Sequence, residues 1–309
     1  MSDPPSAMPS LSESYEDCRS LTRRTAHNFR FSFLTLPREQ RRAMNALYAF
    51  NRITDDLGDD ESLPVEERRC QLAAWRESVR AVLAVAPPEA ALTLNPQPST
   101  LDRYLPAIAD MVARHHIPHE SLFAVIDGVE WDLHPVEVAT FEELERYCYH
   151  VAGAVGLCCI HVWGFREDPA VRQLAIDCGL ALQLTNILRD LAEDADRGRI
   201  YLPREDLERF GYSPDDLHRR VRDRRFRDLM QFEVDRAKGY YARGERLLDH
   251  LAPTGKPILR AMLDIYGGLL REIERRDFDI YSQRVTLPKW QKLWYAGRAV
   301  LKQRLGRLK

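Results

Sequence analysis

The chain has 309 residues, of which 45% are hydrophobic and 30% charged, and its formal net charge is −2. This length is enough for one large core, and the near-neutral charge excludes the strongly basic character of a general nucleic-acid-binding protein. No apolar run approaches the ~18–20 residues of a membrane span, and the start of the chain lacks the basic and apolar regions of a signal peptide. The six cysteines form no CxxC pair and no Cys/His metal spacing, so reduced thiols in a cytoplasmic protein are expected.

Apolar residues recur at three- and four-residue spacing along nearly the whole chain, and alternating strand patterns are scarce. Residues 1–10 are expected to be disordered, and the proline-rich stretch 86–100 is expected to be a surface loop. Ser10 opens the first helix, with Glu13 three residues further on as the second half of a capping box. In chain order, the predicted helices cover residues 11–33, 38–56, 64–85, 105–115, 119–133, 141–163, 169–194, 203–210, 214–248, 256–277 and 289–308.

The absence of strand–helix alternation, of a GxGxxG turn and of a P-loop argues against a nucleotide-binding α/β fold. One all-α domain over residues 11–288 is the simplest prediction, with 289–309 as a basic amphipathic helix at its end. The stretch 86–100 is predicted to be an insertion in this domain, because the two acidic segments described next lie on either side of it.

Two acidic segments carry the strongest chemical signal, although they lie far apart in the sequence. The first acidic segment is DDLGDD, residues 55–60, and the second is DLAED, residues 190–194. Carboxylates at i and i+4 share one face of a helix, and two facing sets of oxygen ligands suit Mg²⁺, which is completed by water and substrate phosphates. The pattern therefore predicts chemistry on a diphosphate. The i, i+4 pairs are Asp55 with Asp59, and Asp190 with Asp194.

Further polar residues extend both segments along their helices. Tyr48 and Arg52 share the stripe of the first acidic segment, and Gln183 and Asn186 share that of the second. A solvated helix end or a polar surface stripe would explain either segment alone. Acids at a helix C-terminus oppose the macrodipole, however, and a bound cation would relieve that cost.

Four stretches of the chain resemble motifs of the squalene/phytoene synthase family, and the similarity extends over most of residues 14–288. The resemblance implies an all-α isoprenoid-synthase fold around one deep central cavity. It also implies an enzyme that joins two prenyl diphosphates head to head. The stretches are 46–60, 126–133 (IDGVEWDL), 147–156 (YCYHVAGAVG) and 183–203, which contains the long and specific run NILRDLAEDADRGRIYLP.

The resemblance also implies roles for single residues, with Mg²⁺ as the metal and Mn²⁺ as its substitute. For Ala152 and Gly156, a role in close packing between helices explains the small side chains as well as a role in substrate binding does. The implied metal ligands are Asp55, Asp56, Asp59, Asp190, Glu193 and Asp194; the catalytic residues are Tyr48, Arg52, Tyr147, Arg189 and Tyr201; and the substrate-binding residues are Asn28, Phe29, Phe33, Val151, Ala152, Gly156, Gln183, Asn186, Arg199 and Arg284.

The implied reaction condenses two farnesyl diphosphates, through a cyclopropyl (presqualene) diphosphate, to a C30 product such as squalene, dehydrosqualene or presqualene diphosphate. Phe33 favours this hypothesis through the resemblance, because it stands where C30-forming members of the family carry a bulky residue that would block longer tails. A phytoene synthase that uses two geranylgeranyl diphosphates is the alternative. A non-catalytic assembly-factor relative and a terpene cyclase are less favoured, since both acidic segments are complete and the AGAVG and RGRIYLP stretches are present. Any use of NADPH stays open.

The end of the chain suggests a contact with a membrane surface. Residues 280–309 contain no acidic residue, and Trp290, Trp294, Leu301 and Leu305 lie near one helical face. A basic amphipathic helix with tryptophans suits an anionic membrane surface, whereas a terminal helix packed on the domain is the alternative. We therefore expect a cytoplasmic protein with peripheral contact at the inner membrane face and no nucleic-acid partner.

Overall fold

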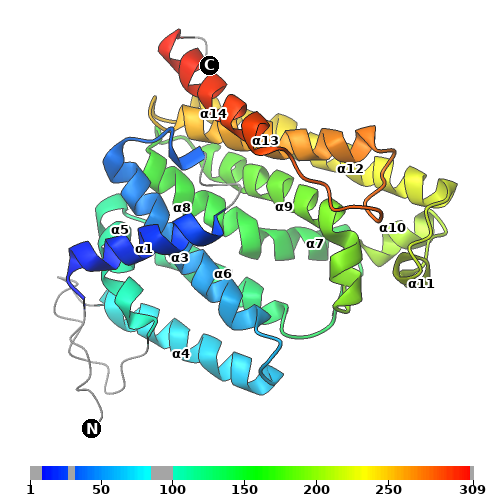
Figure 1. Ribbon diagram of the computed structural model, residues 1–309, viewed down its shortest axis with the longest axis horizontal. Coiled ribbons are helices and arrows are strands. Elements are labelled where there is room, and N and C mark those ends of the chain that lie inside the picture. Colours follow the sequence, from blue (N-terminus) through cyan, green and yellow to red (C-terminus); the bar gives the residue numbers. More distant parts are fainter. Residues whose placement is uncertain (1–8, 27–31, 85–99, 307–309) are drawn as a thin grey trace.

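The structure is a computed structural model that describes residues 9–26, 32–84 and 100–306. Most of the described chain is helical (Figure 1). In chain order the elements are α1 (Leu11–Thr25), α3 (Arg38–Asp59), α4 (Val65–Ala84), η2 (Asp102–Tyr104), α5 (Leu105–His115), α6 (His119–Trp131), β1 (Val136–Glu137), α7 (Phe141–Cys148), η3 (Tyr149–Gly153), α8 (Ala154–Trp163), α9 (Val171–Asp196), β2 (Arg199–Ile200), α10 (Arg204–Arg209), α11 (Pro214–His218), α12 (Arg224–Glu245), η4 (Arg246–Asp249), α13 (Lys256–Arg275) and α14 (Lys289–Arg304).

The predicted all-α fold is confirmed. Most of the predicted N-terminal disorder (1–10) and of the predicted loop (86–100) falls outside the described residues, as do Asn28 and Phe29. In the described ranges, no helix is both long and apolar enough to cross a membrane. All six cysteines are free.

Helix α9 is the axis of the fold and runs through the middle of the molecule (Figure 1). It contacts α8, η3, α12 and α13, and it is buried on most of its sides, as expected for a central helix. Gly179 allows η3 to approach it, because a Cβ at this position would lie 2.4 Å from the carbonyl oxygen of Ala152. The second acidic segment is thus fixed on the central helix of the fold.

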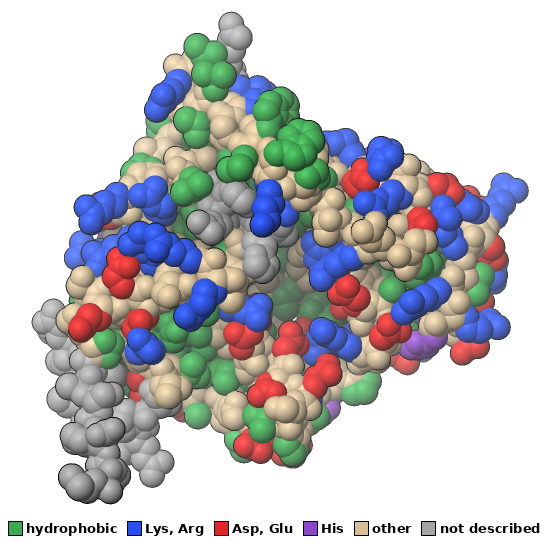
Figure 2. Space-filling view, viewed as in Figure 1, with side chains coloured by type: hydrophobic (Ala, Val, Ile, Leu, Met, Phe, Trp, Pro, Cys, Tyr) green, Lys and Arg blue, Asp and Glu red, His purple; other side chains and the backbone are tan. Residues whose placement is uncertain are grey.

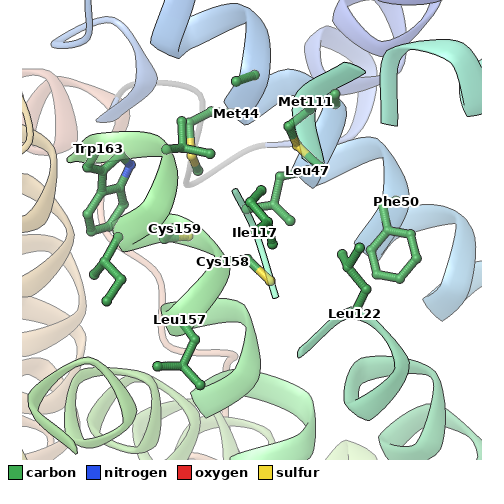
Figure 3. Packing of buried hydrophobic residues seen from close by; sticks show 14 of the residues in the cluster. Met44, Leu47, Phe50, Met111, Ile117, Leu122, Leu157, Cys158, Cys159 and Trp163 are labelled. Carbon is green, nitrogen blue, oxygen red and sulfur yellow. The ribbon is translucent and has the colours of Figure 1, made fainter. Parts of the chain in front are cut away.

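The first half of the chain forms a core around α3. Figure 3 shows Met44, Leu47 and Phe50 of α3 beside Met111, Leu122 and residues of α8. The Phe50 ring also stacks on Trp75 of α4, with 6.1 Å between ring centroids. This packing fixes the direction of α3, whose last turn contains the first acidic segment.

The structure divides two helices that were predicted as continuous. Within 141–163, one wider π-helical turn, η3, lies between α7 and α8. Within 214–248, α11 ends before Arg220, which adopts a left-handed φ of 56°. The Asp223 side chain then accepts a hydrogen bond from the Phe226 amide and caps the start of α12. The predicted first helix also ends early, at Thr25.

Candidate active site

Both acidic segments line one cavity of about 420 Å³, here called the acidic cavity. Asp55 and Asp59 come from the end of α3, and Asp190 and Asp194 come from α9. The structure therefore brings together the two carboxylate pairs that the i, i+4 spacing picked out. Other predicted site residues that line the acidic cavity are Tyr147, Gln183, Asn186, Arg189, Arg199 and Tyr201.

Gly58 sets the position of the first acidic segment. A Cβ at this residue would lie 2.3 Å from Cγ1 of Val129, so only glycine allows α6 to pack this closely on α3. Arg68 donates a hydrogen bond to the Gly58 carbonyl oxygen at 2.7 Å and satisfies one acceptor at the C-terminal end of the helix. The close approach brings the end of α6 beside the carboxylates of α3.

Asp132, just after α6, is a site residue to which the sequence analysis gave no role. The Tyr147 hydroxyl donates to its Oδ2 and the Tyr201 hydroxyl donates to its Oδ1, each at 2.8 Å. The two tyrosine rings stack with 4.8 Å between centroids. Asp132 is the acid near the end of the stretch 126–133, so the resemblance of that stretch was the signal that could have identified it.

A glycine turn and a short sheet hold Arg199 and Tyr201 at the acidic cavity. Gly198 has a φ of 72°, in the left-handed region that favours glycine. The next residues form β2, which pairs in parallel with β1 and places Arg199 opposite Val136. Arg199 then donates to Asp59 Oδ1 at 3.1 Å and to the Asp132 carbonyl oxygen at 3.2 Å. It therefore links the end of α9 to the first acidic segment.

Arginines neutralise part of the second acidic segment. Arg189 donates from Nε to Asp190 Oδ1 at 2.8 Å, and Arg284 Nη2 lies 2.9 Å from the same oxygen. Arg284 also reaches Glu193, with 3.4 Å between Nη1 and Oε2. This wall of the cavity thus combines carboxylates with guanidinium groups, which are the groups that bind phosphate oxygens.

Burial raises the pKa of three carboxyl groups at the acidic cavity. The pKa of Asp55 rises to about 7, through burial and then through the neighbouring Asp59. The pKa of Asp194 also rises to about 7, through burial and then through Asp190. Burial raises the pKa of Asp132 to about 6, although hydrogen bonds from two tyrosines oppose the rise. The cavity therefore holds more carboxylate than its own cations neutralise.

The donor set of the acidic cavity fits a hard divalent cation. Four carboxylates face it from two helices, and the buried Oδ1 of Asn186 has no hydrogen-bond partner among the described residues. In the same ranges, no group of three His, Cys, Asp or Glu side chains is already gathered as a metal site. Such an open arrangement suits Mg²⁺, which retains water ligands and binds through one or two carboxylates and substrate phosphates.

Several predicted site residues do not line the acidic cavity. Arg52 donates from Nε to Asp56 at 3.0 Å, and both side chains are about half-exposed. Tyr48 is half-buried and meets the buried Phe33 edge to face, with 6.5 Å between ring centroids. Glu193 is also half-exposed, beside Arg284.

The predicted substrate-binding residues Val151, Ala152 and Gly156 lie at helix contacts. A Cβ at Gly156 would lie 2.6 Å from the carbonyl oxygen of Ala175 in α9, and Ala152 meets α9 in the same way at Gly179. Val151 packs on Gly128 of α6. Ala152 and Gly156 are therefore small because they allow close packing between helices, which is the alternative explanation that the sequence offered.

An all-α chain with two acidic helix segments at one cavity has the architecture of the isoprenoid synthases. A dehydrosqualene synthase crystal structure shares this fold, with a TM-score of 0.82 and 24% identity over 96% of this chain and 98% of that one. The model of the squalene/phytoene synthase family matches residues 22–291. The chain belongs to this family, whose members are prenyltransferases.

Two named relatives illustrate the similarity. The 15-cis-phytoene synthase of Synechococcus elongatus is 37% identical over 301 residues, which cover 94% of this chain and 93% of that protein. The presqualene diphosphate synthase of Zymomonas mobilis is 37% identical over 270 residues, which cover 86% of this chain and 87% of that protein. The similarity thus includes one relative named for a cyclopropyl diphosphate product and another named for phytoene.

Proposed function

We propose that the protein catalyses the Mg²⁺-dependent head-to-head condensation of two prenyl diphosphates through a cyclopropyl diphosphate. The observation that carries this proposal is the meeting of both acidic segments at one cavity. A non-catalytic relative would have no need to retain two carboxylates with raised pKa values beside a set of arginines.

The four carboxylates of the two i, i+4 pairs would hold Mg²⁺, or Mn²⁺ in its place. Asp56 and Glu193 would support them from the more exposed sides of the two helices. When bound, the divalent ion neutralises the diphosphate that leaves as the allylic C–O bond ionises. The ligands in this proposal are Asp55, Asp59, Asp190 and Asp194.

The arginines would bind the diphosphate directly. Asp190 holds Arg189 at the cavity wall and also pairs with Arg284, which does not itself line the cavity, and Asp59 holds Arg199 at the opposite wall. Their guanidinium groups are fixed before substrate arrives, so little reorganisation is needed when negative charge develops on the leaving group. Gln183 and Asn186 add amide groups to the same wall.

Asp132 and its two tyrosines would move the proton that leaves the carbocation. The Tyr201 hydroxyl oxygen has free lone pairs while its hydrogen is donated to Asp132. It would accept a proton from carbon as it passes its own to the carboxylate, and the C–H electron pair would close the cyclopropane ring. A carboxyl with a pKa of about 6 suits an acceptor near neutral pH.

Farnesyl diphosphate is the first candidate substrate, and it leads to a C30 product. Tyr48 and Phe33 form an aromatic contact two helical turns before Asp55, so a tail that runs along α3 would meet it after roughly 10 Å. Geranylgeranyl diphosphate is the second candidate, favoured by the relatives named phytoene synthase. The similarity to a presqualene diphosphate synthase favours the first.

A peripheral contact between α14 and the inner face of the cytoplasmic membrane is part of the proposal. Trp290 and Trp294 are 69% and 53% exposed, and another side of the helix packs on α13. The product would be a lipid, so a site that releases it at a bilayer avoids exposing a long hydrocarbon chain to water.

Purified protein should be incubated with farnesyl and with geranylgeranyl diphosphate separately, each with Mg²⁺ and with or without NADPH. The proposal predicts a cyclopropyl diphosphate or a C30 hydrocarbon from farnesyl diphosphate. A product from geranylgeranyl diphosphate alone would select the second candidate. No condensation of either substrate would contradict the proposed function.

A further inference from the structure

A second hollow, here called the arginine groove, lies between α1, the start of α3 and α5. Its volume is about 810 Å³, and it shares no lining residue with the acidic cavity. Phe33 and Leu34 line part of it, and Leu34 is 58% exposed. The basic side chains around it are those of Arg19, Arg23, Arg38, Arg41, Arg42 and Arg114.

The groove carries excess positive charge. Six arginines line it against three acids, so its formal charge is three positive with histidine neutral. Arg19 pairs with Glu16 at 3.0 Å and Arg114 pairs with Asp110 at 2.8 Å. The guanidinium of Arg42 lies 3.7 Å from the centre of the Tyr15 ring.

Four of the arginines have no acidic partner. Arg42 lies over the Tyr15 ring, and in the described ranges it forms no ion pair. Arg23, Arg38 and Arg41 likewise form no ion pair with any part of the chain that the structure describes. Like charges gathered around one hollow without counter-charges repel each other, and an anion would relieve the repulsion. Guanidinium groups match the oxygens of a phosphate in geometry as well as in charge.

The arginine groove opens on the same face of the molecule as the exposed side of α14. Figure 2 shows Lys and Arg side chains gathered over α1 and the start of α3, with hydrophobic side chains over α14 above them. The exposed apolar side chains of α14 are Trp290, Leu293, Trp294, Leu301 and Leu305.

We propose that the arginine groove binds the phosphate groups of anionic phospholipids and forms, together with the exposed side of α14, one membrane-docking surface. The inference rests on the proposed membrane contact of α14 and adds a second, lipid-selective contact to it. Tryptophans favour the interface between headgroups and acyl chains, whereas arginines favour the anionic headgroups. Two separate contacts would also fix the orientation of the protein, which α14 alone would not.

Co-sedimentation of the full-length protein with vesicles tests the proposal. The vesicles contain phosphatidylglycerol with phosphatidylcholine, or phosphatidylcholine alone. The test variant is Arg38→Gln/Arg41→Gln. The matched control is Arg224→Gln/Arg275→Gln, which removes the same charge from exposed sites on α12 and α13. A third variant, Trp290→Ser/Trp294→Ser, removes the tryptophans of α14.

We expect the Arg38/Arg41 variant to bind the anionic vesicles about 25-fold more weakly, because each basic residue near an anionic surface contributes about fivefold. The α12/α13 control should bind like the wild type, and the tryptophan variant should lose binding to both kinds of vesicle. Equal loss of vesicle binding in the Arg38/Arg41 variant and its control would overturn the proposal, since any basic surface residue would then contribute equally to binding. Unchanged binding of the arginine variant would overturn it as well.

Titration with inorganic phosphate and with diphosphate, without vesicles, separates a lipid site from a site for a free anion. Weak binding of both, with no competition against vesicles, supports docking. Tight binding of either, abolished in the Arg38/Arg41 variant, would replace the lipid by a soluble ligand and overturn the proposal. Prenyltransferase activity in detergent, with no vesicles present, tests the proposed function separately, and the arginine variants should retain it.

Discussion

The two acidic segments share their spacing but differ in their surroundings. On α3, Asp59 is 52% exposed and has one arginine, Arg199, which comes from a distant part of the chain. On α9, Asp190 is 15% exposed and lies between two arginines. The α9 wall is thus largely neutralised before any ligand binds, whereas the α3 wall remains more dependent on a bound cation.

One feature is common to both walls. In each i, i+4 pair, one carboxylate is held by arginine, and the other, Asp55 or Asp194, has no ion pair in the described ranges. The two unpaired carboxyl groups are also the ones whose pKa burial raises to about 7. Asp55 and Asp194 should therefore gain most from a divalent cation, and the arginine-held partners should gain less.

The largest expected effect follows from removing an unpaired carboxylate. Asp55→Asn and Asp194→Asn should each lower kcat by about 10²–10³-fold, because each removes a fixed negative charge that positions the cation on the leaving group. The matched control is Asp56→Asn, whose exposed side chain pairs with Arg52 and should change kcat only a few-fold. Steady-state assays with product analysis measure kcat. Equal losses of kcat in Asp55→Asn and Asp56→Asn would contradict the distinction between unpaired and arginine-paired carboxylates.

Cation binding should also appear in stability. At about 100 times its dissociation constant, Mg²⁺ should raise the free energy of unfolding by about 2.7 kcal/mol. The gain should nearly vanish in Asp55→Asn and persist in part in Asp190→Asn, because Asp190 is already paired with two arginines and contributes less to cation binding. Thermal unfolding with Mg²⁺ and with EDTA tests this prediction. If Mg²⁺ raised the free energy of unfolding equally in wild type and both variants, the ion would bind at another site.

Asp132 offers a test that depends on pH. Burial raises its pKa in the folded protein from 3.8 to about 6, so the folded state binds this proton more tightly than the unfolded chain does. This contribution to stability is complete below the unfolded pKa and is lost as pH rises through about 6. Between about pH 4.5 and about pH 7.5, wild type should lose at most about 2 kcal/mol relative to Asp132→Asn. Urea unfolding at both values measures the difference, and a constant difference would contradict the assigned shift.

The smallest expected effect concerns the α9 wall. Arg284 is half-exposed, so its coupling to Asp190 should be roughly 1 kcal/mol in a double-mutant cycle on the free energy of unfolding. The cycle uses Arg284→Gln, Asp190→Asn and the double variant. Additive single effects would indicate that the α9 wall is not neutralised from that side.

The sequence was a good guide to features that depend on local spacing. Helical periodicity predicted most of the helices, and i, i+4 acids identified both walls of the acidic cavity. Asp132 received no role because its importance comes from two tyrosines that are distant in the chain. The break at Arg220 was missed for a similar reason, since apolar spacing continues across a residue whose left-handed conformation ends α11.

The same limit applies to Ala152 and Gly156. Small residues on a helix face can line a cavity or let another helix approach. Only the position of α9 in the structure shows that these two residues let another helix approach. For Asp56, an arginine one turn earlier on its own helix is a partner that spacing alone could have supplied. Sequence spacing therefore failed to predict the roles of those residues whose roles depend on contacts with distant parts of the chain.

The π turn η3 has a consequence for insertions and deletions. It adds about one residue to the helical path between α7, which ends just after Tyr147, and α8. Deleting one residue there would restore a regular helix and rotate α7 by about 100° relative to α8. Tyr147 would then point away from Asp132, although no cavity-lining side chain had been replaced. Changes in chain length in this turn should therefore abolish the hydrogen bond between Tyr147 and Asp132.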